Sequence, residues 1–222
     1  MYELLAAAHI SPANQRGLYI LQRLAQEGVI CFAAREGKQP AFALLAEWAP
    51  AAKSLPHEEA LARLAQRYFT SHGPATLQDF IWWTGLTTAD AKAGLEMVKP
   101  QLAHEAIDGK TYWMTHGQPI MKDTSLTAYL LPGFDEYLVG YQDRSAMLEA
   151  SHLRQSGSLH SWLDRAVVID GQIVGTWKRT IKKDKIVIAV SPFTSMTKTA
   201  KRAVAAAASQ YGAFHDVPVV LE

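Results

Sequence analysis

The chain has 222 residues, of which 49% are hydrophobic and 19% are charged. This length and balance suit one large or two small globular domains and exclude a mostly disordered protein. No apolar run reaches the ~18 residues that a membrane-spanning helix needs. The N-terminal MYELLAAAHI is a poor signal peptide, because it carries an acid and no basic residue. The single cysteine, Cys31, excludes an internal disulfide framework. We therefore expect a cytoplasmic protein with a buried, inert thiol.

The net charge of +1 is unevenly distributed along the chain. Residues 171–222 hold eight Lys and Arg against three acids, whereas residues 1–170 hold fourteen against eighteen. The last quarter therefore carries +5 and the rest −4. A basic region of this kind can meet phosphates or an acidic partner, although charge alone favours an ordinary solvated face.

The first 50 residues predict two helices followed by a β-hairpin. Apolar residues recur with a helical period, Gly28 is a natural helix end, and GVICFAAREGKQPAFALL alternates around a Glu36-Gly37-Lys38 turn. The helices expected here span 2–9 and 14–27, and the strands span 29–35 and 40–45. Residues 46–57 contain two prolines and no clear period, so we expect a connector there.

Residues 58–115 predict three helices and a second hairpin. The helices lie in HEEALARLAQRYFTSHG, LQDFIWWTG and ADAKAGLEMV, and the hairpin lies in QLAHEAIDGKTYWMT with an Asp108-Gly109 turn. Thr76 with Asp79 predicts a capping box for the second helix, and Thr87 or Thr88 caps the third.

This is the element order of a winged helix, and residues 2–45 repeat its last two helices and its hairpin. On this interpretation the first copy lacks its first helix. Either the chain starts inside a domain, or another element completes that core, such as an upstream winged-helix segment or a partner.

The C-terminal region predicts a small sheet with one helix. Residues 126–145 look aromatic and extended, with a Pro-Gly turn, and residues 165–190 read as three strands. An Ala-rich helix over 197–211 ends at Gly212, and PVVLE can add a final strand. The fold class is therefore α+β: tandem winged-helix modules (helix-turn-helix plus β-wing) followed by a small β-sheet and helix. The expected domains are a partial winged helix at 1–50, a winged helix at 58–118 and a C-terminal α+β region at 119–222.

The winged helices supply the first candidate DNA contacts. In many such modules the third helix enters the major groove, where Asn and Gln can pair with adenine and Arg with guanine, and the wing touches the backbone. The candidates here are Asn14, Arg16, Arg23, Arg35, Lys38 and Lys110. Protein–protein contact without DNA is the alternative for both modules.

A dense basic cluster supplies a second set of candidates: Lys178, Arg179, Lys182, Lys183 and Lys185. It straddles a predicted strand-turn-strand, and side chains alternate between the faces of a strand, so not all five can share a side. The three lysines at the turn are freest to reach phosphates. A solvated edge that blocks aggregation is the alternative.

The segment LLPGFDEY followed by YQDR is unusual because it packs three carboxylates, one Arg and three aromatics into residues 130–144. Such a density suits a site, where a carboxylate positions water and Arg144 holds a phosphate. Asp135 and Asp143 are the candidate catalytic residues. The alternative is a structural Asp–Arg pair that fixes a turn.

Other catalytic signals are absent from the sequence. There is no GxGxxG, P-loop or GxSxG motif, and the eight histidines are scattered singly. We therefore expect no cofactor and no metal.

Three blocks of sequence, RYFTSHGPATLQDFIWWTGL, LLPGFDEYLVGYQDR and IDGQIVGTWKR, together resemble the winged-helix DNA-binding proteins grouped with the AlkZ-like DNA glycosylases. The resemblance covers roughly residues 15–222. It implies tandem winged helices joined into one DNA-binding unit with a C-terminal β-rich part. It also implies an activity that excises alkylated bases and unhooks interstrand crosslinks without a metal.

The resemblance has two departures. Members of the family are usually longer at the N-terminus, where a further winged-helix portion lies. The glycosylases carry a Gln-x-Gln or Gln-x-acid catalytic motif toward that end, whereas no glutamine of this chain has Gln, Asp or Glu two positions later. No catalytic residue is therefore carried over.

The sequence thus predicts a DNA-binding protein linked to DNA repair, which binds duplex DNA with little sequence preference. The first alternative is an active, metal-independent DNA glycosylase, in which Asp135 or Asp143 would orient water toward the sugar. The second is a protein-interaction module without DNA binding.

Overall fold

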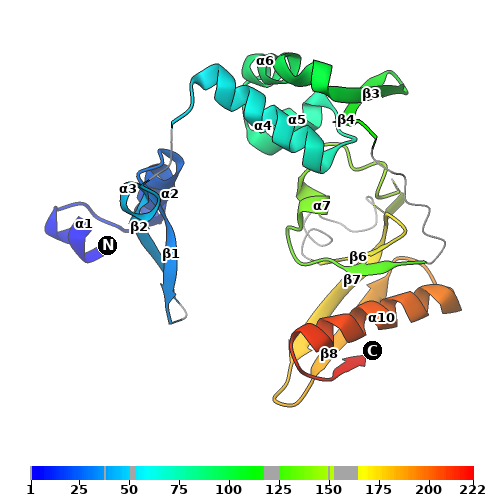
Figure 1. Cartoon of the computed structure of the whole chain (residues 1–222). Coiled ribbons are helices and arrows are strands. Elements are labelled where there is room, and N and C mark those ends of the chain that lie inside the picture. Colours follow the sequence, from blue (N-terminus) through cyan, green and yellow to red (C-terminus); the bar gives the residue numbers. More distant parts are fainter. Residues whose placement is uncertain (1, 38, 51–53, 118–125, 150, 153–164) are drawn as a thin grey trace. The chain divides into compact units, whose positions relative to one another are not determined.

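The structure, a computed structural model, describes the chain except for residues 1, 38, 51–53, 118–125, 150 and 153–164 (Figure 1). It has a mixed α+β fold. The chain divides into two compact units, Met1–Pro56 and His57–Glu222. No helix in the described ranges is long and apolar enough to cross a membrane.

The first unit has the helix, helix, hairpin order that the sequence predicts. Its elements are α1 (Tyr2–Ala7), α2 (Arg16–Gln26), β1 (Ile30–Glu36), β2 (Gln39–Leu44) and α3 (Leu45–Trp48). Helix α2 begins two residues later than predicted, because Asn14 and Gln15 have left-handed φ values of 53° and 62°. The short helix α3 occupies the start of the segment expected to be a connector.

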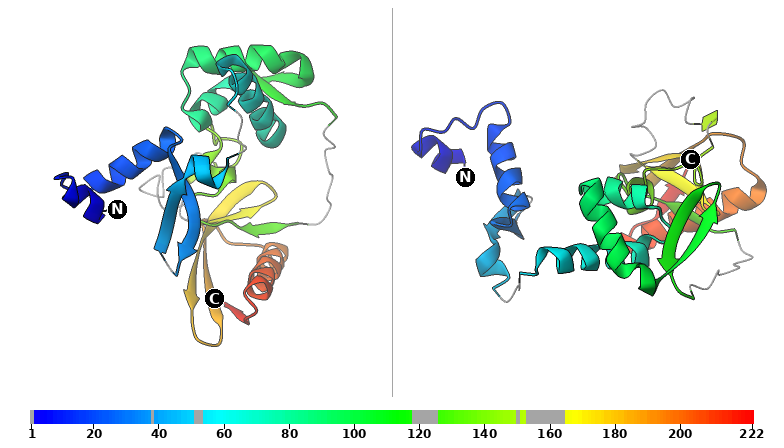
Figure 2. Two further views of the ribbon diagram at one scale, coloured as in Figure 1. Left: turned by 60° about the vertical axis from the view of Figure 1, so that its left-hand side comes forward. Right: turned by 90° about the horizontal axis from the view of Figure 1, so that it is seen from above.

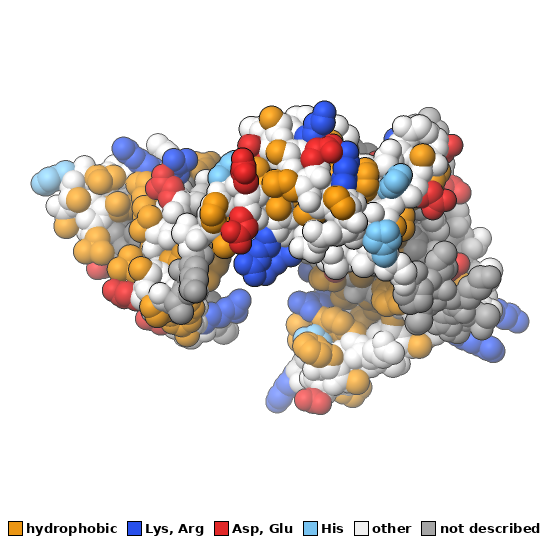
Figure 3. Space-filling model, turned by 45° about the horizontal axis from the view of Figure 1, so that its top comes forward, with side chains coloured by type: hydrophobic (Ala, Val, Ile, Leu, Met, Phe, Trp, Pro, Cys, Tyr) orange, Lys and Arg blue, Asp and Glu red, His pale blue; other side chains and the backbone are white. Residues whose placement is uncertain are grey.

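This first unit has little core. Among its described residues only Gly17 and Ile30 are buried, and hydrophobic side chains reach its surface (Figure 3). Phe32 stacks on Phe42 across the hairpin with ring centroids 5.0 Å apart, yet Phe32 is 71% exposed. Cys31 is half-buried rather than buried as expected, since the first unit encloses few side chains.

The second unit opens with the three helices and hairpin predicted from the sequence. They are α4 (His57–His72), α5 (Leu77–Thr84), α6 (Thr88–Val98), the short 3-10 helix η1 (Lys99–Gln101), β3 (Leu102–Ile107) and β4 (Lys110–Thr115). The predicted capping box at α5 is present, and Thr87 rather than Thr88 caps α6. Their apolar faces enclose a core that includes Tyr68, Phe69 and Phe80.

A five-stranded sheet forms the rest of this unit, in the order β5-β6-β7-β8-β9. Its strands are β5 (Ala128–Leu130), β6 (Ala166–Ile169), β7 (Gln172–Ile181), β8 (Ile186–Pro192) and β9 (Val219–Leu221). All neighbours are antiparallel except β8 and β9, which are parallel. Helix α10 (Lys198–Phe214) lies against one face of the sheet (Figure 2), where Trp177, Ile188 and Val204 share a core.

Helix α10 runs through Gly212, where the sequence predicts its end. A Cβ atom at Gly212 would lie 2.6 Å from Val219 Cγ2 and 2.8 Å from the Val217 carbonyl oxygen. The glycine therefore permits the close approach of β9 to the helix rather than ending it. It belongs to a buried stripe with a spacing of four residues, formed by Ala200, Val204, Ala208 and Gly212.

The sequence predicts an extended segment over residues 126–145, but the structure is extended over only part of it. After β5 the chain forms a turn and the short helix α7 (Glu136–Val139). The Asp135 carboxylate accepts a hydrogen bond from Tyr137 N at 2.9 Å and caps this helix. A local side-chain bond of this kind outweighs the strand preference of the aromatic and branched residues that follow.

Asp79 joins the helical part of the unit to the segment after α7. Its side chain is buried, with 3% exposure. One carboxylate oxygen accepts from Thr76 N at 2.9 Å and from Thr76 Oγ1 at 2.7 Å. The other accepts from Gln142 N at 2.9 Å and from Asp143 N at 3.3 Å. The same carboxylate thus caps α5 and holds residues 142–143 against it.

We expect Asp79→Asn to lower the free energy of unfolding by about 3 kcal/mol, because an amide turns one acceptor oxygen into a donor that faces buried donors. Asp90→Asn changes the corresponding but half-exposed acid of α6 and should lower stability less. Urea unfolding of the two variants measures the difference. Equal losses would contradict the role given to Asp79.

Candidate nucleic-acid interface

The hairpin between β7 and β8 brings three of the predicted lysines together at its tip. Lys182 N donates to the Lys185 carbonyl oxygen at 2.8 Å and closes the turn. Lys182 and Lys183 are exposed and Lys185 is half-exposed. Three ammonium groups on one tight turn can reach neighbouring phosphates of a nucleic-acid backbone.

Lys178 and Arg179 do not belong to the same patch as each other. The Arg179 guanidinium lies 5.6 Å from the centre of the Tyr211 ring on α10, so Arg179 is on the helix-covered face of the sheet. Lys178 is its neighbour along β7 and faces the opposite side. The cluster therefore presents cations at the hairpin tip and on both faces beside it.

Sequence reasoning missed a second basic group on α10, formed by Lys198, Lys201 and Arg202. All three side chains are exposed, and their spacing of three and four residues puts them on one face of the helix. The first turn of α10 contains no acid, although a helix N-terminus favours negative charge. A bound anion would supply the negative charge that the first turn of α10 lacks. The spacing of the basic residues in KTAKR predicts this face. It was missed because the alanines of the helix indicate close packing and drew attention away from the charges.

None of the eight basic residues between 171 and 222 forms an ion pair with another residue that the structure describes. Elsewhere, Lys110 pairs with Asp143 and Lys99 with Glu96. The excess positive charge of the C-terminal quarter is therefore not neutralised within the described chain.

The candidates in the first unit lie on the elements expected, with one exception. Arg16 and Arg23 are two turns apart on α2, and Arg35 is exposed on β1. Asn14 lies in the turn before α2 and not on the helix, which corrects its predicted role on a groove-reading helix. Arg23 is engaged by Glu27, with Nη2 and Oε1 2.7 Å apart, and Lys38 lies outside the described residues.

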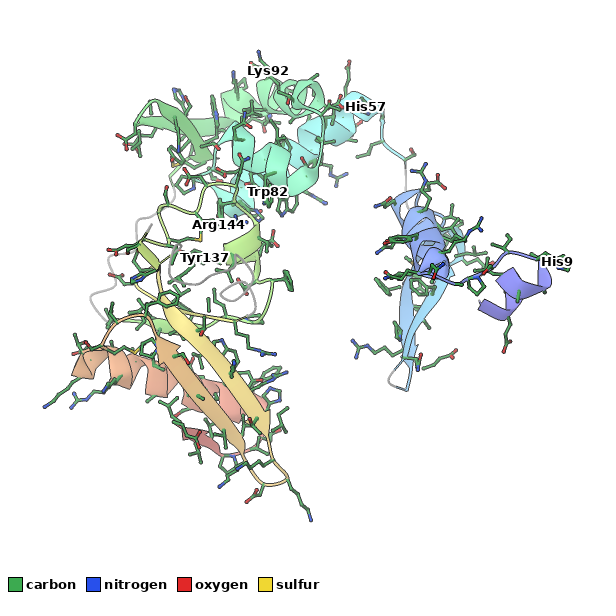
Figure 4. All side chains as sticks on the ribbon, turned by 180° about the vertical axis from the view of Figure 1, so that it is seen from behind. His9, His57, Trp82, Lys92, Tyr137 and Arg144 are labelled. Atoms are coloured by element: carbon green, nitrogen blue, oxygen red, sulfur yellow. The ribbon has the colours of Figure 1, made fainter. Side chains whose placement is uncertain are left out.

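Arg144 lies beside Trp82 between α5 and α7 (Figure 4). Its Nε donates to the Leu138 carbonyl oxygen at 2.6 Å, and its guanidinium is 5.5 Å from the centre of the Trp82 ring. Burial lowers the pKa of Arg144, although arginine stays charged at neutral pH. These contacts show that Arg144 orders the segment around α7.

The two candidate catalytic carboxylates both serve local structure. Asp135 caps α7. Asp143 forms an ion pair with Lys110 and accepts from Ser145 N at 2.9 Å. The hydrogen bond from Lys110 is the main reason that the pKa of Asp143 falls to about 2. A general base works best when its pKa is near the operating pH, so Asp143 is a weak base in this setting.

Asp143 also borders a pocket of about 740 Å³ whose wall includes Tyr112, Tyr137 and Tyr141. Tyr137 donates its hydroxyl hydrogen to the Gly171 carbonyl oxygen at 2.7 Å, and Tyr141 donates to that of His72 at 2.9 Å. Burial raises the pKa of both tyrosines, which keeps them protonated as donors. No group of three His, Cys, Asp or Glu within the described ranges is arranged to hold a metal.

The sequence matches the family model "DNA glycosylase AlkZ-like" over residues 3–214. The chain belongs to the AlkZ-like DNA glycosylase family. It is 28% identical over 198 residues to the interstrand DNA cross-link repair glycosylase of Streptomyces sahachiroi, a match covering 83% of this chain and 51% of that protein.

A solved structure shares the fold. The DNA glycosylase AlkZ of Streptomyces sahachiroi superposes with a TM-score of 0.72 at 24% identity, over 91% of this chain and 57% of that one. The chain thus spans about half the length of the relatives it matches.

The Asp143–Lys110 pair should make stability depend on pH in the acid range. Because the pKa of Asp143 lies at about 2, below its usual 3.8, the pair contributes fully above pH ~4 and is lost as the pH falls through ~2. We expect Asp143→Asn to be less stable than the parent by up to about 1 kcal/mol at pH 6, as is usual for an exposed pair, and by less at pH 2.

Unfolding by urea between pH 2 and pH 6 measures this difference, and Lys110→Met should reproduce the pH profile from the other side of the pair. A parent-to-variant difference that stays constant across this range would contradict the assignment.

Proposed function

We propose that this chain is the DNA-binding part of a DNA glycosylase that acts in DNA repair on damaged duplex DNA. The observation that carries the proposal is the family match over residues 3–214. It favours the glycosylase interpretation over a protein that only binds DNA. The printed activity of the Streptomyces sahachiroi relative, repair of interstrand DNA cross-links, suggests alkylated or cross-linked bases as the lesions.

We propose winged-helix modules as the frame of the binding surface. The order α4, α5, α6, β3, β4 supports one such module over residues 58–118, followed by the α+β region at 119–222. The order α1, α2, β1, β2 supports a partial module over residues 1–50, without a counterpart of α4. Its thin core supports completion by a further element, such as an upstream winged-helix segment or a partner.

The DNA contacts we propose are made mainly to the backbone. The cations at the β7–β8 tip and on α10 lack ion-pair partners in the described chain, and they lie on a hairpin and a helix of the same unit. Arg16 and Arg35 of the first unit are exposed and can add further contacts. Backbone contacts carry no sequence information, so little sequence preference follows.

We propose that the catalytic group is not among these 222 residues. The Gln-x-Gln or Gln-x-acid motif that the resemblance implies is absent from the sequence. Asp135 and Asp143 are committed to a helix cap and an ion pair. These residues therefore supply binding and positioning rather than the attack of water on the sugar.

Lys182→Ala with Lys183→Ala should weaken binding to every duplex by a similar factor and reduce the slope of log affinity against log salt by about 1 to 2, because each neutralised phosphate contributes about one unit. Fluorescence anisotropy between 50 and 200 mM salt (about a fourfold range, where such effects are large) measures both quantities.

Arg63→Ala with Arg67→Ala removes the same charge from α4 and is the matched control, which should change the slope less. A parent chain that does not bind duplex DNA at low salt would favour the protein-interaction alternative. Equal effects of the two double variants would contradict the assignment of the hairpin tip.

The release of an N7-alkylated purine from duplex DNA tests the catalytic part of the proposal. We expect very slow release by this chain, since removing a positioned catalytic group commonly lowers the rate by several orders of magnitude. Asp135→Asn and Asp143→Asn should leave that slow rate unchanged. Rapid release by the parent that one of these variants abolishes would instead identify the active carboxylate.

A further inference from the structure

Phe134 combines high exposure with a strained backbone. Its side chain is 69% exposed, and its φ of 56° lies in the left-handed region. Seven non-glycine residues that the structure describes have positive φ, and five of them are Asn, Asp or His, which tolerate this conformation. A bulky aromatic residue does not, and such strain is retained mainly where a site requires it.

The loop that carries Phe134 is anchored on both sides. Before it, Leu131 N donates to the Ala166 carbonyl oxygen at 2.9 Å, and Trp177 Nε1 donates to the Leu131 carbonyl oxygen at 2.8 Å. After it, Asp135 caps α7, and the Tyr137 hydroxyl donates to the Gly171 carbonyl oxygen at 2.7 Å. The first anchor reaches β6 and β7 and the second reaches the turn between them, so the loop is held on both sides.

We infer that Phe134 inserts between base pairs when the protein opens a damaged duplex. This inference rests on the proposed function. A glycosylase must take its target base out of the stack, and an exposed apolar side chain can hold the opened step by filling the space. The stack would bury a ring that water now surrounds, and the fixed loop means that little freedom is lost on insertion.

One cation, Arg165, lies close to the base of this loop. The Arg165 guanidinium is 5.9 Å from the centre of the Trp177 ring, and the indole of Trp177 is hydrogen-bonded to Leu131. Positive charge near an inserting side chain favours the approach of the two flanking phosphates. The loop therefore combines an apolar side chain at its tip with one arginine at its base.

Phe214 provides a matched control. It is even more exposed, at 83%, but it is the last residue of α10 and contacts only its neighbour His215 among the described rings, with centroids 5.2 Å apart. Its φ is not positive, and no loop anchors present it. Phe214→Ala therefore removes an equal exposed ring without removing the wedge.

The test uses a duplex with 2-aminopurine beside a tetrahydrofuran abasic-site analogue, and an intact duplex of the same sequence. Saturating parent protein should raise the 2-aminopurine fluorescence by about threefold or more on the damaged duplex, because inserted apolar side chains unstack the step. Phe134→Ala should lose most of this rise while binding the intact duplex within about threefold of the parent. Phe134→Leu should keep much of the rise, and Phe214→Ala should match the parent.

A full fluorescence rise with Phe134→Ala would overturn the inference. The inference would also be overturned if Phe134→Ala lost the same affinity for both duplexes and kept the full fluorescence rise at saturation. Phe134 would then be a contact that does not depend on damage. A parent that binds both duplexes without any rise overturns this inference alone, whereas a parent that binds neither overturns the proposed function with it. Thermal melting by circular dichroism confirms that each variant folds. If Phe134→Ala does not fold, Phe134→Leu is the test, and a folded Phe134→Leu protein without any fluorescence rise overturns the inference.

Discussion

The buried carboxylate of Asp79 is the contact on which the second unit depends. Burial of a charged group is costly unless hydrogen bonds replace its lost hydration. Donors from Thr76 and from the backbone of residues 142–143 provide those bonds. Because these donors lie more than 60 residues apart in the sequence, their convergence on one group fixes the segment after α7 against the first turn of α5.

Once residues 142–143 are held, the neighbouring contacts follow. Asp143 reaches Lys110 on β4, and Tyr141 and Tyr68 each donate a hydroxyl hydrogen to a carbonyl oxygen across the same interface. Burial raises the pKa of Tyr68 far above its ordinary value, so this donor is present at any physiological pH. Tyr137 continues the chain of contacts to Gly171, in the turn between β6 and β7. The carboxylate-rich segment is thus the structural link between the helices and the sheet, which explains why its acids are engaged in hydrogen bonds and ion pairs.

The sequence predicts the features that local chemistry determines and misses those that depend on distant contacts. The Thr76–Asp79 capping box and the order of helices and strands over residues 58–115 are local, and the structure has them as predicted. The second pair of donors to Asp79 comes from 63 and 64 residues away, so no local pattern reveals it. The sequence predicts a helix end at Gly212, whereas in the structure this glycine lets Val219 of β9 pack closely against α10. The spacing of Lys198, Lys201 and Arg202 is sufficient to predict a basic face on α10. That these residues form no ion pair in the described chain depends on tertiary structure, which the sequence does not show.

On the proposed function, the placement of charge explains how such a surface can bind DNA and still select damage. A lysine already paired with a carboxylate gains little from a phosphate, because it exchanges one anion for another. The described cations between 171 and 222 have no such pairs, so their attraction to a polyanion is retained. Phosphates are the same at every base pair, so this attraction cannot distinguish a lesion. Discrimination must come from the energy of opening the duplex, which is lowest where a base is damaged or mismatched. An exposed ring on a fixed loop, such as Phe134, converts that difference in deformability into selectivity.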